Sequence, residues 1–399
     1  MEQKPNVVMM GLGYIGLPTA ALMASRDLNV HGVDVNPKVV ETINQGKIHI
    51  VEPDLDGLVH HGVKRGFLKA STSAAKADVY LIAVPTPFKG DHEPDIAYVQ
   101  SATEMILPHL EEGALFIIES TSPIGTTEKM GELIYSKRPE LKGKIHLAYC
   151  PERVLPGNVI HELEHNDRVI GGVDEAASEK AMTFYRNFVK GDLHKTNART
   201  AEMCKLTENA SRDVSIAFAN ELSLICDKAG IDVWELIQLA NKHPRVNILQ
   251  PGVGVGGHCI AVDPWFIVSA FPEESKLIRG ARELNNYKSD WVIEKIKNAS
   301  LTFENKNGRK PIIACFGLAF KPNIDDLRES PALYIAKEIV KFDSNTMVVE
   351  PNVEEHASFT LSTMENAIEK ADILSLLVSH REFEGLNNNS KAINFCGLK

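Results

Sequence analysis

The sequence has neither a long apolar run nor the opening of a secreted protein. None of its apolar segments approaches the about 20 residues that a membrane-spanning helix requires. The chain begins MEQKPNV and passes directly into a strand-like run, without the charged start and apolar core of a signal peptide. These two absences predict a cytoplasmic protein with no membrane partner.

A basic block is also missing. Acidic residues number 53 against 43 lysines and arginines, which gives a net charge of −10 with histidine neutral. An acidic chain without a basic segment is a poor match for nucleic acid, so we expect no nucleic-acid partner. An anionic ligand would have to be held by a few placed cations and by backbone amides.

Cysteine is scarce and scattered. No two of the six cysteines form a CxxC pair, which argues against both a zinc ribbon and a disulfide framework. We expect reduced thiols, most of them packed as small core residues. Histidine, cysteine and acidic residues do not cluster at metal-ligand spacing, so the sequence predicts no metal. The cysteines are Cys150, Cys204, Cys226, Cys259, Cys315 and Cys396.

What the chain does have is alternation of strands and helices at both ends. Its 399 residues are too many for one hydrophobic core, so two or three domains are expected. Strands alternating with helices are typical of a doubly wound parallel sheet, which we expect to extend to about residue 190. The predicted strands are residues 6–10, 30–34, 79–84, 115–119 and 145–149, with helices at 14–25 and 96–110.

A long helical run, residues 198–230, interrupts this pattern. Gly230 suits its C-terminal end, and Asp232 suits the N-cap of a following helix. A helix of about 30 residues exceeds the usual length in globular proteins. We therefore expect it to bridge two domains or to form a subunit interface, with helical structure continuing to about residue 300.

A second, smaller α/β segment follows. The polar stretch ENKNGRKP at 304–311 predicts a linker. Alternation then resumes. The predicted strands are residues 312–317, 346–351 and 373–378, and the predicted helices are 332–341 and 363–370.

The first strand leads into the motif GLGYIG at residues 11–16, then a helix, a second strand and Asp34. Gly11 permits a tight turn, Gly13 lets the backbone approach a pyrophosphate, and Gly16 allows close packing of helix on strand. Amides at the helix start, around Tyr14 and Ile15, would face the phosphates. The motif in this setting predicts a dinucleotide site; an ordinary glycine turn is the alternative.

The acid at the end of the second strand indicates which dinucleotide binds. Asp34 can accept a hydrogen bond from a ribose 2′-hydroxyl and would repel a 2′-phosphate, so NAD is favoured over NADP. Pro85 and Thr86 follow a later strand at the carboxyl edge, where open α/β sheets bind ligands. They are candidate cofactor contacts, or residues of a plain loop.

The most unusual stretch is GVGVGGHCIAVDPW at residues 252–265. Its four glycines let the backbone approach a ligand and create concavities lined with amides. Cys259 would lie beside His258 and near a helix start, surroundings that lower a thiol pKa. The alternatives are a buried structural cysteine, with Asp263 and Pro264 serving only as N-cap and first residue of a short helix.

Together these stretches resemble the UDP-glucose/GDP-mannose dehydrogenase family over nearly the whole chain. The order of the matching segments is also that of the family, and PERVLPGN and GGHCIAVDPW are most similar to its members that oxidise UDP-N-acetyl-D-mannosamine. The segments are GLGYIGLP (11–18), PTP (85–87), ESTSPIGTT (119–127), CPERVLPGN (150–158), AEMCKLTENA (201–210), GVGVGGHCIAVDPW (252–265) and GLAFKPNIDDLRESPA (317–332).

The resemblance implies a four-electron oxidation that uses two NAD⁺ in turn. The C6 alcohol of UDP-N-acetyl-D-mannosamine becomes an aldehyde, which Cys259 traps as a thiohemiacetal. Loss of a second hydride gives a thioester, and water releases the uronate for surface-polysaccharide precursor synthesis. The physical logic agrees, because an aldehyde has no good hydride-donating form until a nucleophile adds to it, and thiolate is the strongest side-chain nucleophile.

The resemblance also implies roles for residues outside the glycine-rich stretch. Lys205 and Asn209 stand four apart on one helix face and would stabilise an oxyanion at C6. Asp263 would order the hydrolytic water or hold Lys205. Thr121 and Glu152 would hold a catalytic water, with Glu152 as general base, and Thr121 would also contact the cofactor. Without the family, Lys205 would be a solvated helix lysine and Glu152 a loop carboxylate.

The remaining ligands follow in the same way. Arg245 would reach the substrate of its own chain or of a partner subunit, and is otherwise an exposed loop arginine. Arg328, whose fork suits phosphate, would bind the cofactor and Lys321 the nucleotide sugar, with Asp325 and Asp326 as structural partners of these cations. The full substrate-binding set is Glu152, Arg153, Val154, Lys205, Asn209, Arg212, Arg245, Gly256, His258 and Lys321.

The predicted fold class is α/β. We expect an NAD-binding Rossmann domain at 1–190, a central helical dimerisation domain at 191–303 and a Rossmann-like UDP-sugar domain at 304–399. The chain closes AINFCGLK, where the family usually has an Asp-rich strand end, which leaves the last strand in doubt.

Three other readings of the function stay open. The same chemistry could act on UDP-N-acetylglucosamine, UDP-glucose or GDP-mannose. A two-electron hydroxy-acid dehydrogenase would use the Lys205 and Asn209 pair alone, with Cys259 structural. A catalytically silent sensor of NAD or sugar would bind without turnover.

Overall fold

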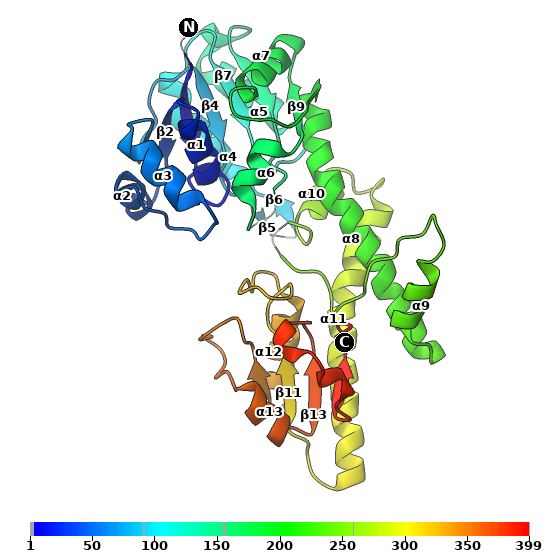
Figure 1. Cartoon of the computed structure of the whole chain (residues 1–399). Coiled ribbons are helices and arrows are strands. Elements are labelled where there is room, and N and C mark those ends of the chain that lie inside the picture. The colour runs from blue at the N-terminus through cyan, green and yellow to red at the C-terminus, as the bar shows by residue number, and fades with distance from the viewer. Residues whose placement is uncertain (1–3, 91, 155–156, 258, 399) are drawn as a thin grey trace. The chain divides into compact units, whose positions relative to one another are not determined.

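The computed structural model describes residues 4–90, 92–154, 157–257 and 259–398 (Figure 1). The chain divides into two compact units, Met1–Thr207 and Glu208–Lys399. The division falls within the long helix α8 (Ala198–Ala229), which confirms the helix predicted at 198–230. Within the described ranges, no helix combines the length and apolarity needed to cross a membrane.

The N-terminal unit is built on an eight-stranded sheet in the order β10-β9-β8-β7-β4-β1-β2-β3. The segment β3-β2-β1-β4-β7-β8 has the doubly wound order, with its switch point between β1 and β4. All neighbours are parallel except β8 and β9. The strands are β1 (Asn6–Met10), β2 (Asn29–Val33), β3 (Leu68–Ser71), β4 (Val79–Ile82), β7 (Leu115–Ile118), β8 (His146–Tyr149), β9 (Arg168–Gly172) and β10 (Leu193–Asn197), with a separate hairpin of β5 (Phe88–Lys89) and β6 (Glu93–Pro94).

Helices cover both faces of this sheet, because its strands are apolar on both sides. Val7 and Met9 belong to the core cluster that α1, α3, α6 and α7 join, whereas Val8 and Met10 face the cluster that includes α4 and α5. The elements are α1 (Gly16–Ser25), α2 (Pro37–Asn44), α3 (Leu55–Lys64), α4 (Ala97–Ile106), η1 (Leu107–His109), α5 (Thr126–Lys137), η2 (Pro139–Leu141), α6 (Val159–His165) and α7 (Glu175–Tyr185).

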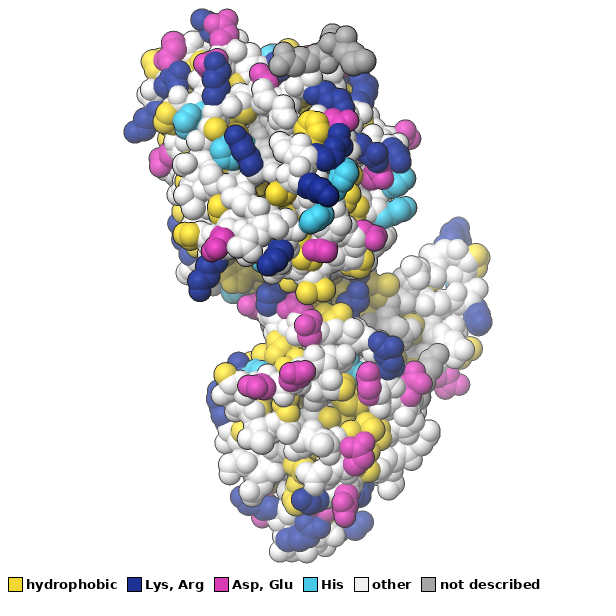
Figure 2. All heavy atoms as spheres, turned by 60° about the vertical axis from the view of Figure 1, so that its left-hand side comes forward, with side chains coloured by type: hydrophobic (Ala, Val, Ile, Leu, Met, Phe, Trp, Pro, Cys, Tyr) yellow, Lys and Arg dark blue, Asp and Glu magenta, His cyan; other side chains and the backbone are white. Residues whose placement is uncertain are grey.

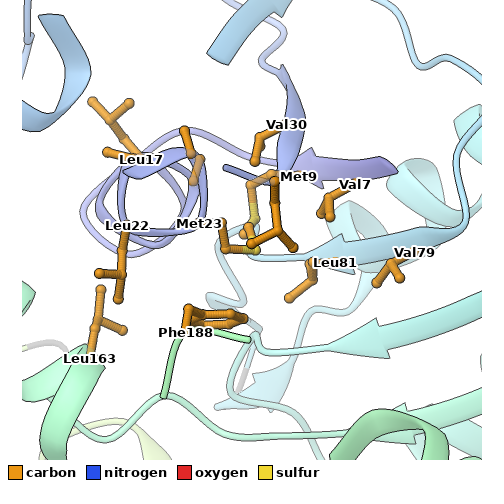
Figure 3. Packing of buried hydrophobic residues seen from close by; sticks show 14 of the residues in the cluster. Val7, Met9, Leu17, Leu22, Met23, Val30, Val79, Leu81, Leu163 and Phe188 are labelled. Atoms are coloured by element: carbon orange, nitrogen blue, oxygen red, sulfur yellow. The ribbon is translucent and has the colours of Figure 1, made fainter. Parts of the chain in front are cut away.

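Packing around α1 fixes the helix that follows the first glycine turn. Figure 3 shows Leu22 and Met23 of α1 directed toward Leu163 and Phe188, and all four side chains are buried in one cluster. Burying a side chain of this size contributes about 1.5–3 kcal/mol. The last turn of α1 is therefore packed into the core on this face of the sheet.

The C-terminal unit contains a four-stranded parallel sheet in the order β12-β11-β13-β14. One face packs against α11 and α12, and the other packs against α13. The elements are α9 (Val233–Ala240), α10 (Asp263–Ala270), α11 (Lys276–Asn307), β11 (Ile313–Phe316), α12 (Pro331–Phe342), β12 (Met347–Val349), α13 (Met364–Lys370), β13 (Ile373–Leu376), η3 (Arg381–Phe383), η4 (Leu386–Asn388) and β14 (Ala392–Asn394).

The α/β fold class is confirmed, with one local correction. Asp232 caps α9 as predicted, since its carboxylate accepts hydrogen bonds from the amides of Trp234 and Glu235. The linker predicted at 304–311 is wrong in its first half, because α11 continues to Asn307 and ends at Gly308. Gly308 adopts the left-handed conformation (φ +67°) that ends helices, so the polar residues before it form an exposed last turn.

The doubtful C-terminal end forms a strand after all. Residues of β14 pair in parallel with β13, from Ala392 opposite Leu374 to Asn394 opposite Leu376. On the molecular face in Figure 2, Lys and Arg side chains are interspersed with Asp and Glu, as expected from a sequence without a basic block.

Candidate active site

The glycine turn between β1 and α1 has room for a ligand only because of its glycines. Gly11 has φ +92°, and a Cβ there would lie 2.5 Å from the carbonyl oxygen of Ala83. A Cβ at Gly16 would overlap the carbonyl oxygen of Gly11, whereas no atom lies within 4 Å of the Cβ position of Gly13. No side chain caps α1, so the amides of its first turn can bind a phosphate.

The predicted ribose acceptor stands beside this turn. Asp34 is half-buried, and its carboxylate accepts hydrogen bonds from the amides of Leu12 (3.1 Å) and Asn36 (2.9 Å). A carboxylate has about four acceptor positions, so Asp34 retains capacity for a hydroxyl. Tyr14 is 53% exposed and Ile15 is half-buried at the mouth of the turn. These residues fit NAD.

The other predicted cofactor contacts follow the neighbouring strands β4 and β7. Thr86 and Thr121 are half-buried, and Pro85 is exposed. The hydroxyl of Ser120 accepts a hydrogen bond from the Val84 amide (2.9 Å), which ties the end of one strand to the next. The two segments therefore lie at one edge of the sheet, beside the switch point.

Lys205 and Glu152 lie together in the N-terminal unit. Lys205 Nζ is 2.7 Å from the Glu152 carbonyl oxygen and 3.9 Å from Glu152 Oε2. Lys205 is only 9% exposed, so it is not the solvated helix lysine that its sequence alone favoured. The Glu152 carboxylate also accepts a hydrogen bond from the Val154 amide, which folds the segment back on itself.

The other predicted substrate ligands near this segment differ in exposure. Arg153 is half-buried, and its Nη1 donates to the carbonyl oxygen of Asp167 at 3.4 Å. Val154 packs against the edge of the apolar core. Arg212 lies on the part of α8 that belongs to the C-terminal unit, where it is exposed.

Two buried acids that support these segments escaped the sequence analysis. Glu202 accepts hydrogen bonds from the amides of Gly125 (2.5 Å) and Thr127 (2.8 Å), and so anchors the segment after Thr121. Glu52 accepts from the amides of Gly157 (3.0 Å) and Val159 (2.8 Å), at the end of the Glu152 segment. Glu202 stands three residues before Lys205 on α8, and this spacing was the available signal.

In the C-terminal unit, Cys259 stands one turn before α10. Its carbonyl oxygen accepts hydrogen bonds from the amides of Val262 (3.0 Å) and Asp263 (2.8 Å), and the residue is half-buried. The six cysteines, all within the described ranges, form no disulfide. His258, predicted beside the thiol and as a substrate ligand, lies outside the described residues.

Asp263 is not the N-cap of α10. The cap position is Val262, whose backbone is already helical (φ −109°, ψ −55°), so Asp263 is the first helical residue and Pro264 the second. Asp263 is 3% exposed. Its carboxylate instead accepts a hydrogen bond from Asn209 Nδ2 at 2.5 Å. Two predicted catalytic side chains are thereby brought together.

The glycine-rich loop before Cys259 contacts the segment at the start of the last α/β region. The Gly257 amide donates to the carbonyl oxygen of Arg328 at 3.1 Å. A Cβ at Gly256 would lie 2.7 Å from the side chains of both Phe320 and Pro331. Glycine is therefore required here by close packing of loop on loop.

The remaining predicted cations are accessible. Lys321 and Arg245 are exposed. The Arg328 guanidinium forms a bidentate ion pair with Asp326 (2.6–3.1 Å), which confirms the structural partner expected for this arginine. In the described part of the chain, no group of three or more histidine, cysteine or acidic residues could hold a metal ion.

Three family models match consecutive parts of the chain. They describe the NAD-binding domain of the UDP-glucose/GDP-mannose dehydrogenase family at residues 5–189, its central domain at 199–287 and its UDP-binding domain at 314–395. The chain belongs to this family. It is accordingly an NAD-dependent nucleotide-sugar dehydrogenase.

Individual family members are similar over almost their full length. UDP-N-acetyl-D-mannosamine dehydrogenase of Escherichia coli is 56% identical over 96% of this chain and 96% of that protein. NDP-N-acetyl-D-galactosaminuronic acid dehydrogenase of Ralstonia nicotianae is 53% identical over 96% of this chain and 93% of that protein. The solved structure of UDP-D-ManNAc dehydrogenase from Pyrococcus horikoshii matches with 39% identity and a TM-score of 0.86, covering 98% of this chain and 93% of that one.

The UDP-binding region of this family member partly repeats the geometry of its NAD turn. The Gly317 amide donates to the Val349 carbonyl oxygen, as Gly11 does to Val33, both at 2.8 Å. Glu350, after β12, then stands where Asp34 stands after β2, and it accepts from the amides of Leu318, Ala319 and Asn352 (2.7–3.0 Å) and from His380 (3.1 Å).

Glu350 differs from Asp34 in being closed off. Glu350 is 4% exposed and His380 is 0% exposed. Although burial opposes ionisation, the hydrogen bonds from His380 and from backbone amides lower the pKa of Glu350 to about 2. This acid therefore serves the fold of the loop after β11, a role that the sequence analysis did not foresee.

Proposed function

We propose that the protein oxidises the C6 alcohol of UDP-N-acetyl-D-mannosamine to UDP-N-acetyl-D-mannosaminuronate with two NAD⁺ and one water. The observation that carries the choice of sugar is the 56% identity to the Escherichia coli enzyme of that name over 96% of both chains. The product would serve surface-polysaccharide precursor synthesis.

The chemistry follows from the side chains that the chain offers. NAD⁺ held at the turn of Gly11, Gly13 and Gly16 would supply the hydride acceptor for C6 in each of two oxidations. The Cys259 thiolate adds to the aldehyde carbon to give a thiohemiacetal, which loses the second hydride to become a thioester. Water then attacks the thioester carbon, the C–S bond breaks, and the carboxylate leaves with the thiol restored. Four electrons leave the sugar as two hydrides, and the remaining protons pass to water.

Each catalytic role is supported by a local contact. Lys205, buried beside Glu152, would place a positive charge at the developing oxyanion, and Asn209, one helical turn later, would donate a hydrogen bond to it. Asp263 orients the Asn209 amide and would order the hydrolytic water. Glu152, with Thr121 holding the water, would act as general base.

The wider binding set is proposed on the same basis. NAD would contact Gly11, Gly13, Tyr14, Ile15, Gly16, Asp34, Pro85, Thr86, Thr121 and Arg328. The sugar nucleotide would contact Glu152, Arg153, Val154, Lys205, Asn209, Arg212, Arg245, Gly256, His258 and Lys321. The corresponding domains are residues 1–190, 191–303 and 304–399.

We further propose a cytoplasmic homodimer formed through the central helices. Four large apolar side chains on the second half of α8, on α9 and between them are more than half exposed in a single chain. Such exposure is typical of an interface. They are Phe218 (51%), Ile225 (56%), Ile231 (51%) and Leu239 (61%).

A second sugar has specific support. The Ralstonia nicotianae relative, named for an N-acetyl-D-galactosaminuronic acid, is nearly as similar at 53% identity. The identities to these two relatives, 56% and 53%, both favour a nucleotide sugar that carries an N-acetylated hexosamine. They differ too little to choose between the epimers of that sugar. An N-acetylgalactosamine nucleotide is therefore the alternative that the comparison supports, beside the sequence-based alternatives UDP-N-acetylglucosamine, UDP-glucose and GDP-mannose.

The deciding experiment measures NADH absorbance with a panel of UDP-N-acetyl-D-mannosamine, UDP-N-acetylgalactosamine, UDP-N-acetylglucosamine, UDP-glucose and GDP-mannose. We expect fastest turnover on the first and two NADH per sugar. One NADH per sugar, with full activity retained by Cys259→Ser, would instead establish a two-electron dehydrogenase. NAD binding with no NADH from any sugar would establish a sensor.

A further inference from the structure

The glycine-rich loop that precedes Cys259 is held by buried side chains of two helices in the same unit. The Gly252 amide donates to Asn220 Oδ1 on α8 at 2.9 Å, and Ser289 Oγ on α11 donates to the Val253 carbonyl oxygen at 2.8 Å. A Cβ at Gly254 would lie 2.7 Å from the same Ser289 hydroxyl. The loop therefore lies flat against α11.

Asn220 is itself fixed from behind. Its Nδ2 donates to Asn285 Oδ1 at 2.8 Å, and Asn285 Nδ2 donates to Asp213 Oδ1 at 2.8 Å. Asp213 in turn pairs with Arg282 at 2.6 Å. These four residues are at most 2% exposed. The chain of bonds leaves Asn220 one orientation, with its oxygen toward the loop.

Such a network is costly to bury. Asp213 Oδ2 and Arg282 Nε have no hydrogen-bond partner among the described residues. Burial lowers the pKa of Arg282 and raises the pKa of Asp213. In both residues this effect outweighs the attraction between the two charges, which acts in the opposite direction. A buried ion pair of this kind adds little net stability compared with apolar packing, and its attested use is to specify one arrangement.

The thiol follows a second anchor of the same loop. After Gly252 and Val253, the loop is fixed again at Gly257 by the Arg328 carbonyl oxygen. Two residues later, the Cys259 carbonyl oxygen is bound by α10. The backbone that carries the thiol is thus held at both ends while the side chain stays half-buried.

We propose that Asn220 and Ser289 are positioning residues that hold the Cys259 thiol for attack on the aldehyde. This inference rests on the proposed function, because only the second oxidation uses the thiol. Misplacement of a reacting group by about 1 Å can reduce a rate by roughly 100-fold. Loosening the loop should therefore slow oxidation of the aldehyde and spare oxidation of the alcohol.

The test compares Ser289→Ala and Asn220→Ala with a matched control, Ser300→Ala. Ser300 is a buried serine of the same helix (4% exposed), eleven residues farther on. That distance is about 16 Å along the axis. In the full-length enzyme, rapid-mixing kinetics resolve the two NADH-forming phases, and chemical trapping detects released aldehyde.

In Ser289→Ala we expect the second NADH-forming phase to slow by about ten-fold or more, because the thiol is misplaced. The rate of the first phase should stay within about two-fold of wild type. Trapped aldehyde should appear, and Asn220→Ala should behave in the same direction. Equal slowing of both phases, or an unchanged second phase, would overturn the inference. Ser300→Ala should match wild type.

A second measurement is independent of substrate. Amide hydrogen exchange over peptides spanning residues 250–262 should accelerate in Ser289→Ala but not in Ser300→Ala. If wild-type enzyme yields no second NADH, the proposed function fails, and hydrogen exchange still reports whether the loop is clamped. If exchange is unchanged in Ser289→Ala, the clamp itself is refuted.

Discussion

Lys205 Nζ lies 2.7 Å from the backbone carbonyl oxygen of Glu152, so the proposed oxyanion stabiliser is bonded to the residue proposed as general base. Both residues belong to the N-terminal unit, and both side chains are at most 14% exposed. A cation held in a protected setting is worth more to a developing negative charge than one in open water. The contact also places the Glu152 segment relative to α8.

Lys205→Met should therefore abolish most of the first oxidation. We expect the rate of the first NADH-forming phase to fall by roughly 100-fold or more, as when an oxyanion donor is removed. Lys228→Met, which alters an exposed lysine of the same helix, is the matched control. Stopped-flow absorbance measures both, and a Lys205 variant with wild-type rates would remove this residue from the mechanism.

Gly16→Ala should weaken NAD binding. The new methyl group would overlap the Gly11 carbonyl oxygen and displace the turn that approaches the pyrophosphate. We expect the Kd for NAD from calorimetry to rise about ten-fold or more, equal to about 1.4 kcal/mol. Gly57→Ala in α3, where no atom lies within 4 Å of the added Cβ, should bind NAD normally. An unchanged Kd in Gly16→Ala would show that the turn tolerates displacement.

Lys288 should make the C-terminal unit more stable as pH rises above neutrality. Lys288 is 3% exposed, and its ammonium lies 2.6 Å from Ser223 Oγ and 3.9 Å from the centre of the Trp291 ring. Burial lowers the pKa of Lys288 from 10.5 to about 8. Between these values the unfolded chain binds the extra proton, so the free energy of unfolding rises with pH. The full gain is about 3 kcal/mol.

Denaturant unfolding at pH values from 7 to 10, followed by tryptophan fluorescence, measures this gain. All three tryptophans of the chain lie in the C-terminal unit. Lys288→Met should flatten the rise, whereas Lys306→Met, an exposed change on the same helix, should retain it. Parallel pH curves for wild type and Lys288→Met would contradict the assignment.

Glu350 should make the same unit sensitive to acid. Since its pKa falls from 4.5 to about 2 on folding, the folded state binds fewer protons in this range, and stability decreases as pH falls through it. The stability present above pH 4.5 and lost by about pH 2 is about 3 kcal/mol. In Glu350→Gln the free energy of unfolding should depend less steeply on pH in this acidic range. Glu354→Gln, which changes an exposed glutamate, should keep the wild-type dependence.

Local chemistry explains which parts of the fold the sequence revealed. The β1 turn, α1 and the Asp232 cap depend on neighbours within a few residues, and each lies where predicted. The start of α10 was misjudged by one residue, because Asp263 bonds to Asn209, 54 residues away. Its tertiary partner overrides the capping preference of aspartate.

The supporting residues could not be found in this way. Glu202 binds amides 75 and 77 residues away, and Asn220 and Asn285 meet across 65 residues. Asn and Glu in a helix look like surface residues until the partner helix is placed beside them. The sequence therefore suggested which groups to propose as reacting, whereas the side chains that hold them were found only once the helices were placed beside one another.

The closed environment of Glu350 bears on the order of events in turnover. The C-terminal sheet repeats the glycine contact of the NAD turn, yet the hydrogen-bonding positions of its acid, Glu350, are already occupied. Fourteen residues also separate the end of β11 from the start of α12 at Pro331. If the turn after β1 is where NAD binds, as proposed above, and the saturated turn after β11 does not bind it, the first NADH would have to depart before the second NAD⁺ could enter. During that exchange the half-oxidised sugar would be free to diffuse away. A covalent bond to Cys259 would retain it until the second electron pair has left.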